Sequence, residues 1–133
     1  MRVLALDHGE ARCGCALSDP SGTLATPIGA VERPDTRRGL ATVAGLVAEH
    51  GAERVVVGLP LTLAGEEGEQ AGRARAFAER LGARVEVPVE LWDERLTTRQ
   101  ADRTGGGADR DSRAAAHLLE AWLQAHANAG SGA

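Results

Sequence analysis

Hydrophobic and polar residues alternate in short runs along the first part of the 133-residue chain, a pattern typical of strands. Strand-like runs occupy residues 3–6, 12–17 and 23–31. A turn at Gly9 separates the first two runs, and the turn at 19–22 (Asp-Pro-Ser-Gly) separates the second from the third. Because the runs follow one another so closely, we predict an antiparallel meander.

Helix-like periodicity begins after this meander. Apolar residues spaced three and four apart predict a helix that Asp35 or Thr36 caps and that ends near His50-Gly51. The uninterrupted apolar run at 54–59 predicts a strand buried on both faces, which the chain reaches through this helical crossover.

The second half of the chain continues with four more elements and two irregular segments. They are a loop at 60–68, a helix at 69–81, a strand at 85–92 that Pro88 weakens at its start, a short helix from Thr97 or Thr98, a flexible break at 104–108 and a last helix at 111–127. Strands joined first by turns and later by helices predict an α/β fold, a mixed sheet with helices on its faces. We expect one domain over residues 1–127 and a disordered tail over 128–133.

Composition narrows the class of protein. No apolar run approaches the roughly 18 residues of a membrane span, and the first residues lack the pattern of a secretory signal, so we expect a cytoplasmic protein without a membrane partner. Cys13 and Cys15 have no second cluster of zinc ligands, which favours small core residues. The net charge of −4 does not exclude nucleic acid: all 15 basic residues are Arg, which binds phosphate well, and a metal-dependent nuclease needs acidic residues.

Acidic residues stand where several predicted elements end or begin. Asp7 ends the first strand, Asp93 and Glu94 end the last strand, and Asp111 begins the last helix. Strand ends at one edge of such a sheet form a natural site, and carboxylate oxygens are the ligands that Mg²⁺ and Mn²⁺ prefer. Two such ions about 4 Å apart activate a water molecule and stabilise the leaving oxygen of a phosphodiester. The pattern predicts a hydrolytic site with a pair of Mg²⁺ or Mn²⁺ ions.

Each carboxylate also has a purely structural interpretation. Asp7 shares the strand parity of Val3 and Ala5 and so continues an inward face, but an aspartate before a glycine also suits a turn. Asp111 lies on the apolar face of its helix, although Asp is also a preferred N-cap. Strand periodicity leaves the choice between Asp93 and Glu94 open.

Basic side chains surround the proposed site in the sequence. They are Arg95, Arg99, Arg103, Arg110 and Arg113. They suit phosphate contacts, and the alternative is a solvated charged face. For His8 a turn position is favoured over contact with substrate or metal.

Four segments together resemble one known family. The segments LALDHGEARCGCALSDP, VVVGLPLTLAGEEG, LWDERLTT and DSRAAAHLL occur in the order and spacing of the YqgF/RuvX family of pre-16S rRNA nucleases, which is similar to the RuvC-type Holliday junction resolvases. The resemblance covers about residues 2–123. It implies an RNase H-like fold with a five-stranded mixed sheet in the order 3-2-1-4-5.

The resemblance also implies an activity and its residues. The implied activity is metal-dependent phosphodiester hydrolysis at the 5′ end of the 16S rRNA precursor, with Asp7, Glu94 and Asp111 as catalytic metal ligands, so the resemblance favours Glu94 over Asp93. The candidate nucleic-acid-binding residues are Arg12, Arg95, Thr97, Thr98, Arg99, Arg110 and Arg113. We expect a monomer or weak homodimer that acts on nucleic acid, with RNA favoured over branched DNA.

Some positions depart from the family pattern. Glu10 and Ala11 stand where the family often has Thr and Lys, and Thr62 stands where Asn is usual. A lost Lys and an added Glu near Asp7 reduce the attraction for phosphate there. Three other functions are compatible with parts of the sequence: a DNA junction resolvase, a non-catalytic ribosome-assembly factor, and an actin-like kinase or ATPase. The last of these needs a second phosphate loop, which the chain lacks.

Overall fold

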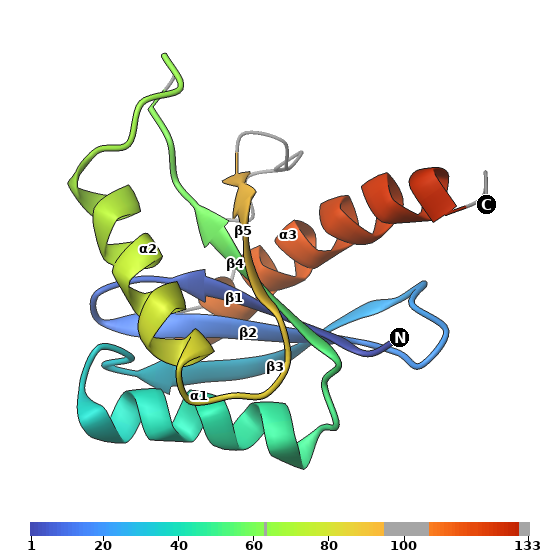
Figure 1. Cartoon of the computed structure of the whole chain (residues 1–133), viewed down its shortest axis with the longest axis horizontal. Coiled ribbons are helices and arrows are strands. Elements are labelled where there is room, and N and C mark those ends of the chain that lie inside the picture. Colours follow the sequence, from blue (N-terminus) through green and yellow to red (C-terminus); the bar gives the residue numbers. More distant parts are fainter. Residues whose placement is uncertain (63, 95–106, 131–133) are drawn as a thin grey trace.

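The computed structural model describes residues 1–62, 64–94 and 107–130 (Figure 1). The described strands are β1 (Val3–His8), β2 (Arg12–Ser18), β3 (Ala25–Glu32), β4 (Arg54–Leu59) and β5 (Val89–Asp93). The described helices are α1 (Arg37–Glu49), α2 (Glu69–Gly82) and α3 (Gly107–Gly130).

The strands form one mixed sheet in the order β3-β2-β1-β4-β5. β1 and β2 pair antiparallel, as do β2 and β3, whereas β4 pairs parallel to both β1 and β5. The predicted meander, the α/β class and the sheet order are therefore confirmed. Because β1, β3, β4 and β5 run in the same direction, their carboxyl ends meet at one edge of the sheet, beside the turn between β1 and β2 (Figure 1).

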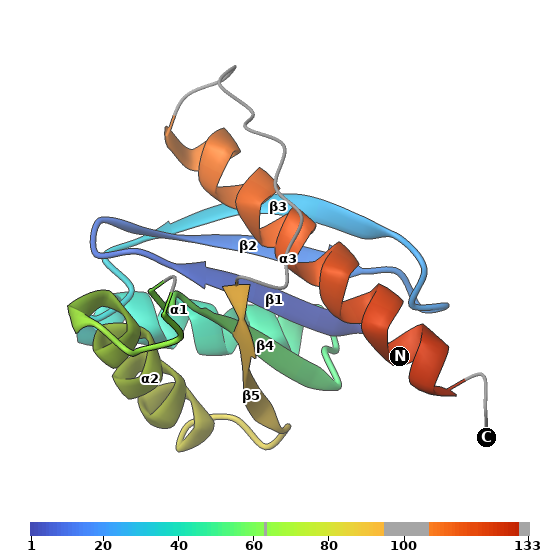
Figure 2. The ribbon, with the colours of Figure 1, turned by 90° about the horizontal axis from the view of Figure 1, so that it is seen from above.

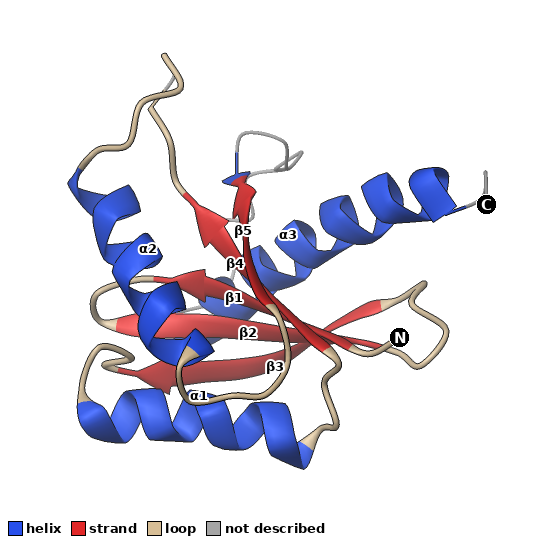
Figure 3. Cartoon of the chain, viewed as in Figure 1, coloured by secondary structure: helices blue, strands red, loops and turns tan. Residues whose placement is uncertain are grey.

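Helices cover both faces of the sheet, with an apolar layer on each face (Figure 2 and Figure 3). On one face, Leu4 and Leu6 of β1 pack in a core that includes side chains of α1 and α2. On the other face, Val3 and Ala5 pack in a core that includes side chains of α3. Alternation along β1 thus divides its side chains between the two layers, and Asp7 falls on the face of α3.

Several boundaries differ from the predicted ones. The strand predicted from residue 85 begins at Val89, because Pro88 has no N–H to donate to a ladder; its carbonyl accepts from Val55 N instead. The last helix begins at Gly107, inside the predicted flexible break, so Asp111 is not its N-cap and that interpretation is wrong.

Other predictions on local structure hold. Thr36 caps α1 by accepting a hydrogen bond from Gly39 N at 3.0 Å, and the helix ends at Glu49 with His50 as C-cap.

The end of the last helix differs from the predicted one. The disordered tail was predicted from residue 128, whereas α3 continues to Gly130. Residues 131–133 and the short helix predicted from Thr97 or Thr98 lie outside the described residues.

The cysteines are core residues, as predicted. Cys13 and Cys15 are buried, reduced and packed in the layer of α1 and α2. Burial and the neighbouring Cys15 raise the pKa of the Cys13 thiol above its usual range, so this thiol stays protonated. None of the described helices is long and apolar enough to cross a membrane.

The closest approach of α3 to the sheet is at Gly14 of β2. A Cβ atom at this position would overlap the backbone carbonyl of Asp111 and lie 2.9 Å from Ser112 N. Only a residue without a side chain lets the first turns of α3 lie directly on β2. Gly14 pairs with Asp7 in the sheet, so this contact brings the backbone of Asp111 next to Asp7.

We expect Gly14→Ala to destabilise the fold. The new methyl group meets backbone atoms, which move only if α3 shifts, so the free energy of unfolding should fall by about 1–3 kcal/mol. Urea denaturation measures this change. The matched control is Gly45→Ala in α1, where a Cβ meets nothing within 4 Å and the gain in helix propensity should raise stability by about 0.5–1 kcal/mol. Equal stabilities for Gly14→Ala and the wild type would contradict the close approach of α3.

Candidate active site

A cavity of about 440 Å³ opens at the edge where the strands end. Carboxylates from three separate elements line it: Asp7 from β1, Glu94 directly after β5 and Asp111 from α3. The remaining lining residues are His8, Gly9, Arg12, Pro60, Leu61 and Gln70. The structure therefore brings the three predicted acidic residues, which are far apart in the sequence, to one cavity.

Asp7 is the most firmly positioned of the three. It is the fifth residue of the six-residue strand β1 and pairs with Gly14 on β2. On its other side, the parallel ladder reaches Leu6 and Val57, which places Gly58 of β4 beside Asp7. Asp7 thus stands between two strand positions that carry no side chain, on the sheet face that α3 covers.

Glu94 fills the space beside Gly58. A Cβ atom at Gly58 would lie 2.6 Å from Oε1 of Glu94 and 3.0 Å from its Cγ and Cδ. The side chain of Glu94 therefore lies across β4, the strand next to Asp7. Asp93 is the last residue of β5 and does not line the cavity. The geometry favours Glu94 where strand periodicity alone left the choice open.

Asp111 lies in the second turn of α3 and binds an arginine. Its Oδ2 accepts a hydrogen bond from Arg12 Nε at 2.9 Å, and about a third of each side chain is exposed to solvent (39% for Arg12 and 30% for Asp111). Ala115, Leu118 and Trp122 continue the same side of the helix into the core, as the apolar periodicity predicted. Arg12 thus neutralises the carboxylate of Asp111 at the rim of the cavity.

The donor set suits a hard divalent cation. All three acidic side chains that line the cavity offer carboxylate oxygens, the ligands of Mg²⁺ and Mn²⁺. Within the described ranges, no three acidic, His or Cys side chains are grouped closely enough to hold an ion together. The ion pair with Arg12 uses Oδ2 of Asp111, so the arginine would compete with a metal for this carboxylate.

His8 has a structural role that the sequence did not reveal. It is the last residue of β1 rather than a turn residue, and its side chain is 2% exposed. Nε2 lies 2.9 Å from Oδ1 of Asp35, and the ring packs at 4.8 Å from the ring of Phe77. His8 therefore ties β1 to the segment before α1 and to α2.

The predicted nucleic-acid contacts are described only in part. Arg12 lines the cavity, Arg110 is exposed on α3, and Arg113 is half-buried on the same helix. Arg95, Thr97, Thr98, Arg99 and Arg103 lie outside the described residues. The sequence pattern did not single out two glycines beside Asp7, Gly14 and Gly58. An isolated glycine inside a strand often marks the close approach of another group, and this signal could have identified both positions.

Comparison with known proteins gives the family. The model of the RuvX family, described as Holliday junction resolvase, matches residues 1–125. A relative from Rhodococcus erythropolis is 44% identical over 146 residues (96% of this chain and 80% of the relative). A relative from Myxococcus xanthus is 42% identical over 135 residues (95% of this chain and 89% of the relative). Both carry the name "Putative pre-16S rRNA nuclease".

A solved structure confirms the fold. RuvC of T. thermophilus in complex with a Holliday junction substrate superposes with a TM-score of 0.63 at 16% identity, over 95% of each chain. This likeness supports the RNase H-like architecture that the four sequence segments implied. The family match over nearly the whole chain and the identity to both relatives show that this chain belongs to the RuvX family.

Proposed function

We propose that this protein is a metal-dependent nuclease, a hydrolase that cleaves phosphodiester bonds during processing of the 5′ end of the 16S rRNA precursor. The observation that carries the proposal is the convergence of Asp7, Glu94 and Asp111 on one cavity at the carboxyl ends of the strands. The names of the relatives support precursor rRNA as the substrate. A role in rRNA processing implies a cytoplasmic protein.

Asp7, Glu94 and Asp111 would hold one or two Mg²⁺ or Mn²⁺ ions, and we favour two. The bound metal supplies an activated water and charge stabilisation at the leaving oxygen of the phosphodiester. Asp7 would contribute the most, because its backbone pairs with β2 and directly follows the last residue of β1 that pairs with β4. We infer that it is the ligand common to both ions.

Arg12 would change partner during substrate binding. In the structure its guanidinium binds Asp111, and both side chains line the cavity. If Asp111 held the metal instead, the guanidinium of Arg12 would remain at the rim of the cavity, where it could bind a phosphate of the substrate. One side chain thus neutralises the free site and then orients the bound nucleic acid.

A junction resolvase is the second candidate function. The description of the family and the fold shared with RuvC favour it. Resolvases of this kind cut two strands in concert as symmetric dimers, whereas we favour a monomer or weak homodimer acting on RNA. Side-by-side cleavage of precursor rRNA, single-stranded RNA and a four-way DNA junction, with Mg²⁺ or Mn²⁺, distinguishes the two functions. A non-catalytic assembly factor would cleave none of them.

Asp7→Asn should separate catalysis from stability. The variant keeps the shape of the side chain but removes a negative charge, so in EDTA its melting temperature should equal or exceed that of the wild type. Millimolar Mn²⁺ should stabilise the wild type, by about 2.7 kcal/mol when the ion is at 100 times its Kd, and should stabilise the variant much less. RNA cleavage should fall by orders of magnitude.

The control for this prediction is Glu86→Gln, which makes the same charge change at an exposed position that does not line the cavity. It should keep both the Mn²⁺ response and the cleavage rate. If Asp7→Asn instead melts earlier and still cleaves RNA at the rate of the wild type, the residue is structural and the proposal fails.

Arg12→Gln should strengthen metal binding while weakening RNA binding. The variant removes the cation that competes for Asp111. Exposed pairs of this kind are worth about 0.2–1 kcal/mol, so the Kd for Mn²⁺ should fall by about 1.4- to 5-fold. Calorimetric titration measures it. The matched control is Arg54→Gln, which breaks the equally exposed pair with Glu90 away from this cavity and should leave the Kd unchanged. An Mn²⁺ affinity unaltered by Arg12→Gln would argue against the exchange of partners.

Gly58→Ala should impair the site without unfolding the protein. The new Cβ meets only the flexible end of the Glu94 side chain, so stability should change by less than about 1.5 kcal/mol. Displacing Glu94 should nevertheless weaken Mn²⁺ binding by about 10-fold or more. Titration should therefore show a weaker Mn²⁺ affinity, while urea denaturation shows a nearly unchanged stability. Wild-type Mn²⁺ affinity in this variant would show that Glu94 is not a ligand.

A further inference from the structure

A row of cavities leads away from the acidic site along the turn between β1 and β2. Gly9 and Arg12, at the two ends of this turn, line the acidic cavity. Glu10 and Ala11, at its centre, line a second cavity together with Arg33. Arg33 also lines a third cavity, of about 580 Å³, between the end of β3 and the start of α1. Residues of this turn therefore connect the first two cavities, and Arg33 connects the second to the third.

The backbone fixes Arg33 at the junction of the second and third cavities. Its N–H donates to the carbonyl of Ala11 at 2.8 Å, and its carbonyl accepts hydrogen bonds from the backbone and hydroxyl of Thr36 at 3.1 and 2.7 Å. Gly39 of α1 packs so tightly here that a Cβ would overlap the Arg33 carbonyl. Arg33 has φ 47°, a left-handed conformation that few residues other than glycine adopt. The start of the side chain is therefore held in one place.

The arginines in this region differ from others in the described chain. Arg12, Arg54, Arg73 and Arg75 each form an ion pair with a carboxylate. Arg33, Arg37 and Arg38 are exposed and, within the described ranges, form no ion pair. Three unneutralised cations stand together in a chain whose net charge is −4.

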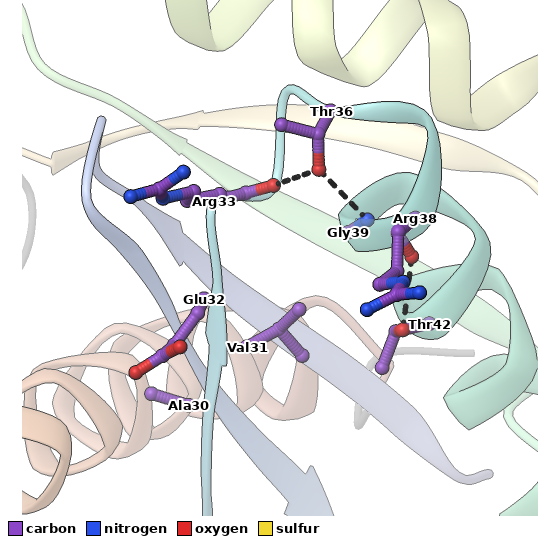
Figure 4. Close-up of a pocket in the computed structure, with 8 residues that line it drawn as sticks. All are labelled: Ala30, Val31, Glu32, Arg33, Thr36, Arg38, Gly39 and Thr42. Atoms are coloured by element: carbon purple, nitrogen blue, oxygen red, sulfur yellow. Dashed lines mark hydrogen bonds between the residues drawn. The ribbon is translucent and has the colours of Figure 1, made fainter.

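The surroundings of these arginines offer little negative charge to two of them. Arg37 and Arg38 stand in the first turn of α1, which has no acidic residue and where the helix dipole disfavours cations. Figure 4 shows the guanidinium of Arg38 beside Thr42 at the third cavity, with that of Arg33 across the end of β3. Glu32 also lines this cavity, and Figure 4 shows its carboxylate on the same side of β3 as the guanidinium of Arg33, although the two form no ion pair.

Two acidic residues along the row have partners. Glu10 lies 3.4 Å from Arg73, and Asp35 forms a hydrogen bond of 2.9 Å with Nε2 of His8. The row therefore passes from the proposed metal site, over these two contacts, to arginines without an ion-pair partner among the described residues. β1 and β3 are separated only by β2, so the backbone of β3, which Arg33 follows directly, lies roughly 10 Å (two strand spacings) from that of β1.

We propose that Arg33 and Arg38 bind successive backbone phosphates of a single nucleic-acid strand that extends from the acidic cavity across the turn between β1 and β2. This inference rests on the proposed nuclease function and adds a second contact region to it. Arginine binds phosphate through a planar fork of donors. Two phosphate contacts outside the cleavage site would make the enzyme prefer substrates with several nucleotides on that side of the scissile bond.

The test compares oligouridylates of about 20 and about 4 nucleotides, bound in EDTA so that a metal-dependent nuclease leaves them intact. The double variant Arg33→Gln/Arg38→Gln should weaken binding of the long RNA by about 10-fold. The slope of log K against log salt should flatten by about 1.4, since each lost phosphate contact on a single strand contributes about 0.7. The advantage of the long over the short RNA should shrink accordingly.

The matched control is Arg84→Gln. Arg84 is also exposed and unpaired among the described residues, but it lines none of the three cavities. It should keep the affinity and salt slope of the wild type. If the double variant binds the long RNA like the Arg84→Gln control, the phosphate contacts are refuted while the nuclease function stands. If the wild type neither binds RNA nor cleaves it with Mn²⁺, the proposed function itself fails.

Discussion

The candidate site depends on two strand positions that carry no side chain. Asp7 lies between Gly14 on β2 and Gly58 on β4, and other parts of the chain fill both spaces. The backbone of α3 occupies the first space and the side chain of Glu94 occupies the second. Any larger residue at either position would separate one of the acidic residues from Asp7. The sheet therefore brings the carboxylates together in two ways. It positions acidic side chains, and it has glycine at the two positions where a side chain would keep them apart.

Gathering acidic groups has an electrostatic cost, which the ion pair between Arg12 and Asp111 reduces in the free protein. Like charges repel when no cation lies between them, and Arg12 supplies one at the rim of the cavity. Under the proposed function the same pair would compete with metal binding, because the arginine and the metal would bind the same carboxylate. Its partial exposure keeps the pair weak enough to exchange. The balance between stability without metal and affinity for metal is thus set largely at one residue.

The sequence predicted the architecture better than it predicted the details of the site. Alternation along β1 placed Asp7 on the face of Val3 and Ala5, and the apolar spacing in the last helix placed Asp111 near the core; both hold. The predicted start of the last helix was wrong. A run of glycines disfavours a helix locally, whereas packing on β2 and β3 stabilises α3, which begins at Gly107. The position of His8 was also wrong: its neighbour Gly9 suggested a turn, but pairing with Cys13 extends the strand. Packing and strand pairing with residues far away in the sequence leave no signal in a short window of sequence.

The order of the carboxylates along the chain has a consequence for biosynthesis. Asp7 lies in the first strand, whereas Asp111 lies in the last helix, which packs mainly on β2 and β3. A chain still being synthesised holds Asp7 before it holds Asp111, and it has a complete set of carboxylates only after α3 has docked over Gly14. Under the proposed function, a nascent chain without a folded α3 would lack one of its metal ligands and should not cleave RNA. The order of the elements along the chain would therefore delay cleavage until α3 has folded onto the sheet.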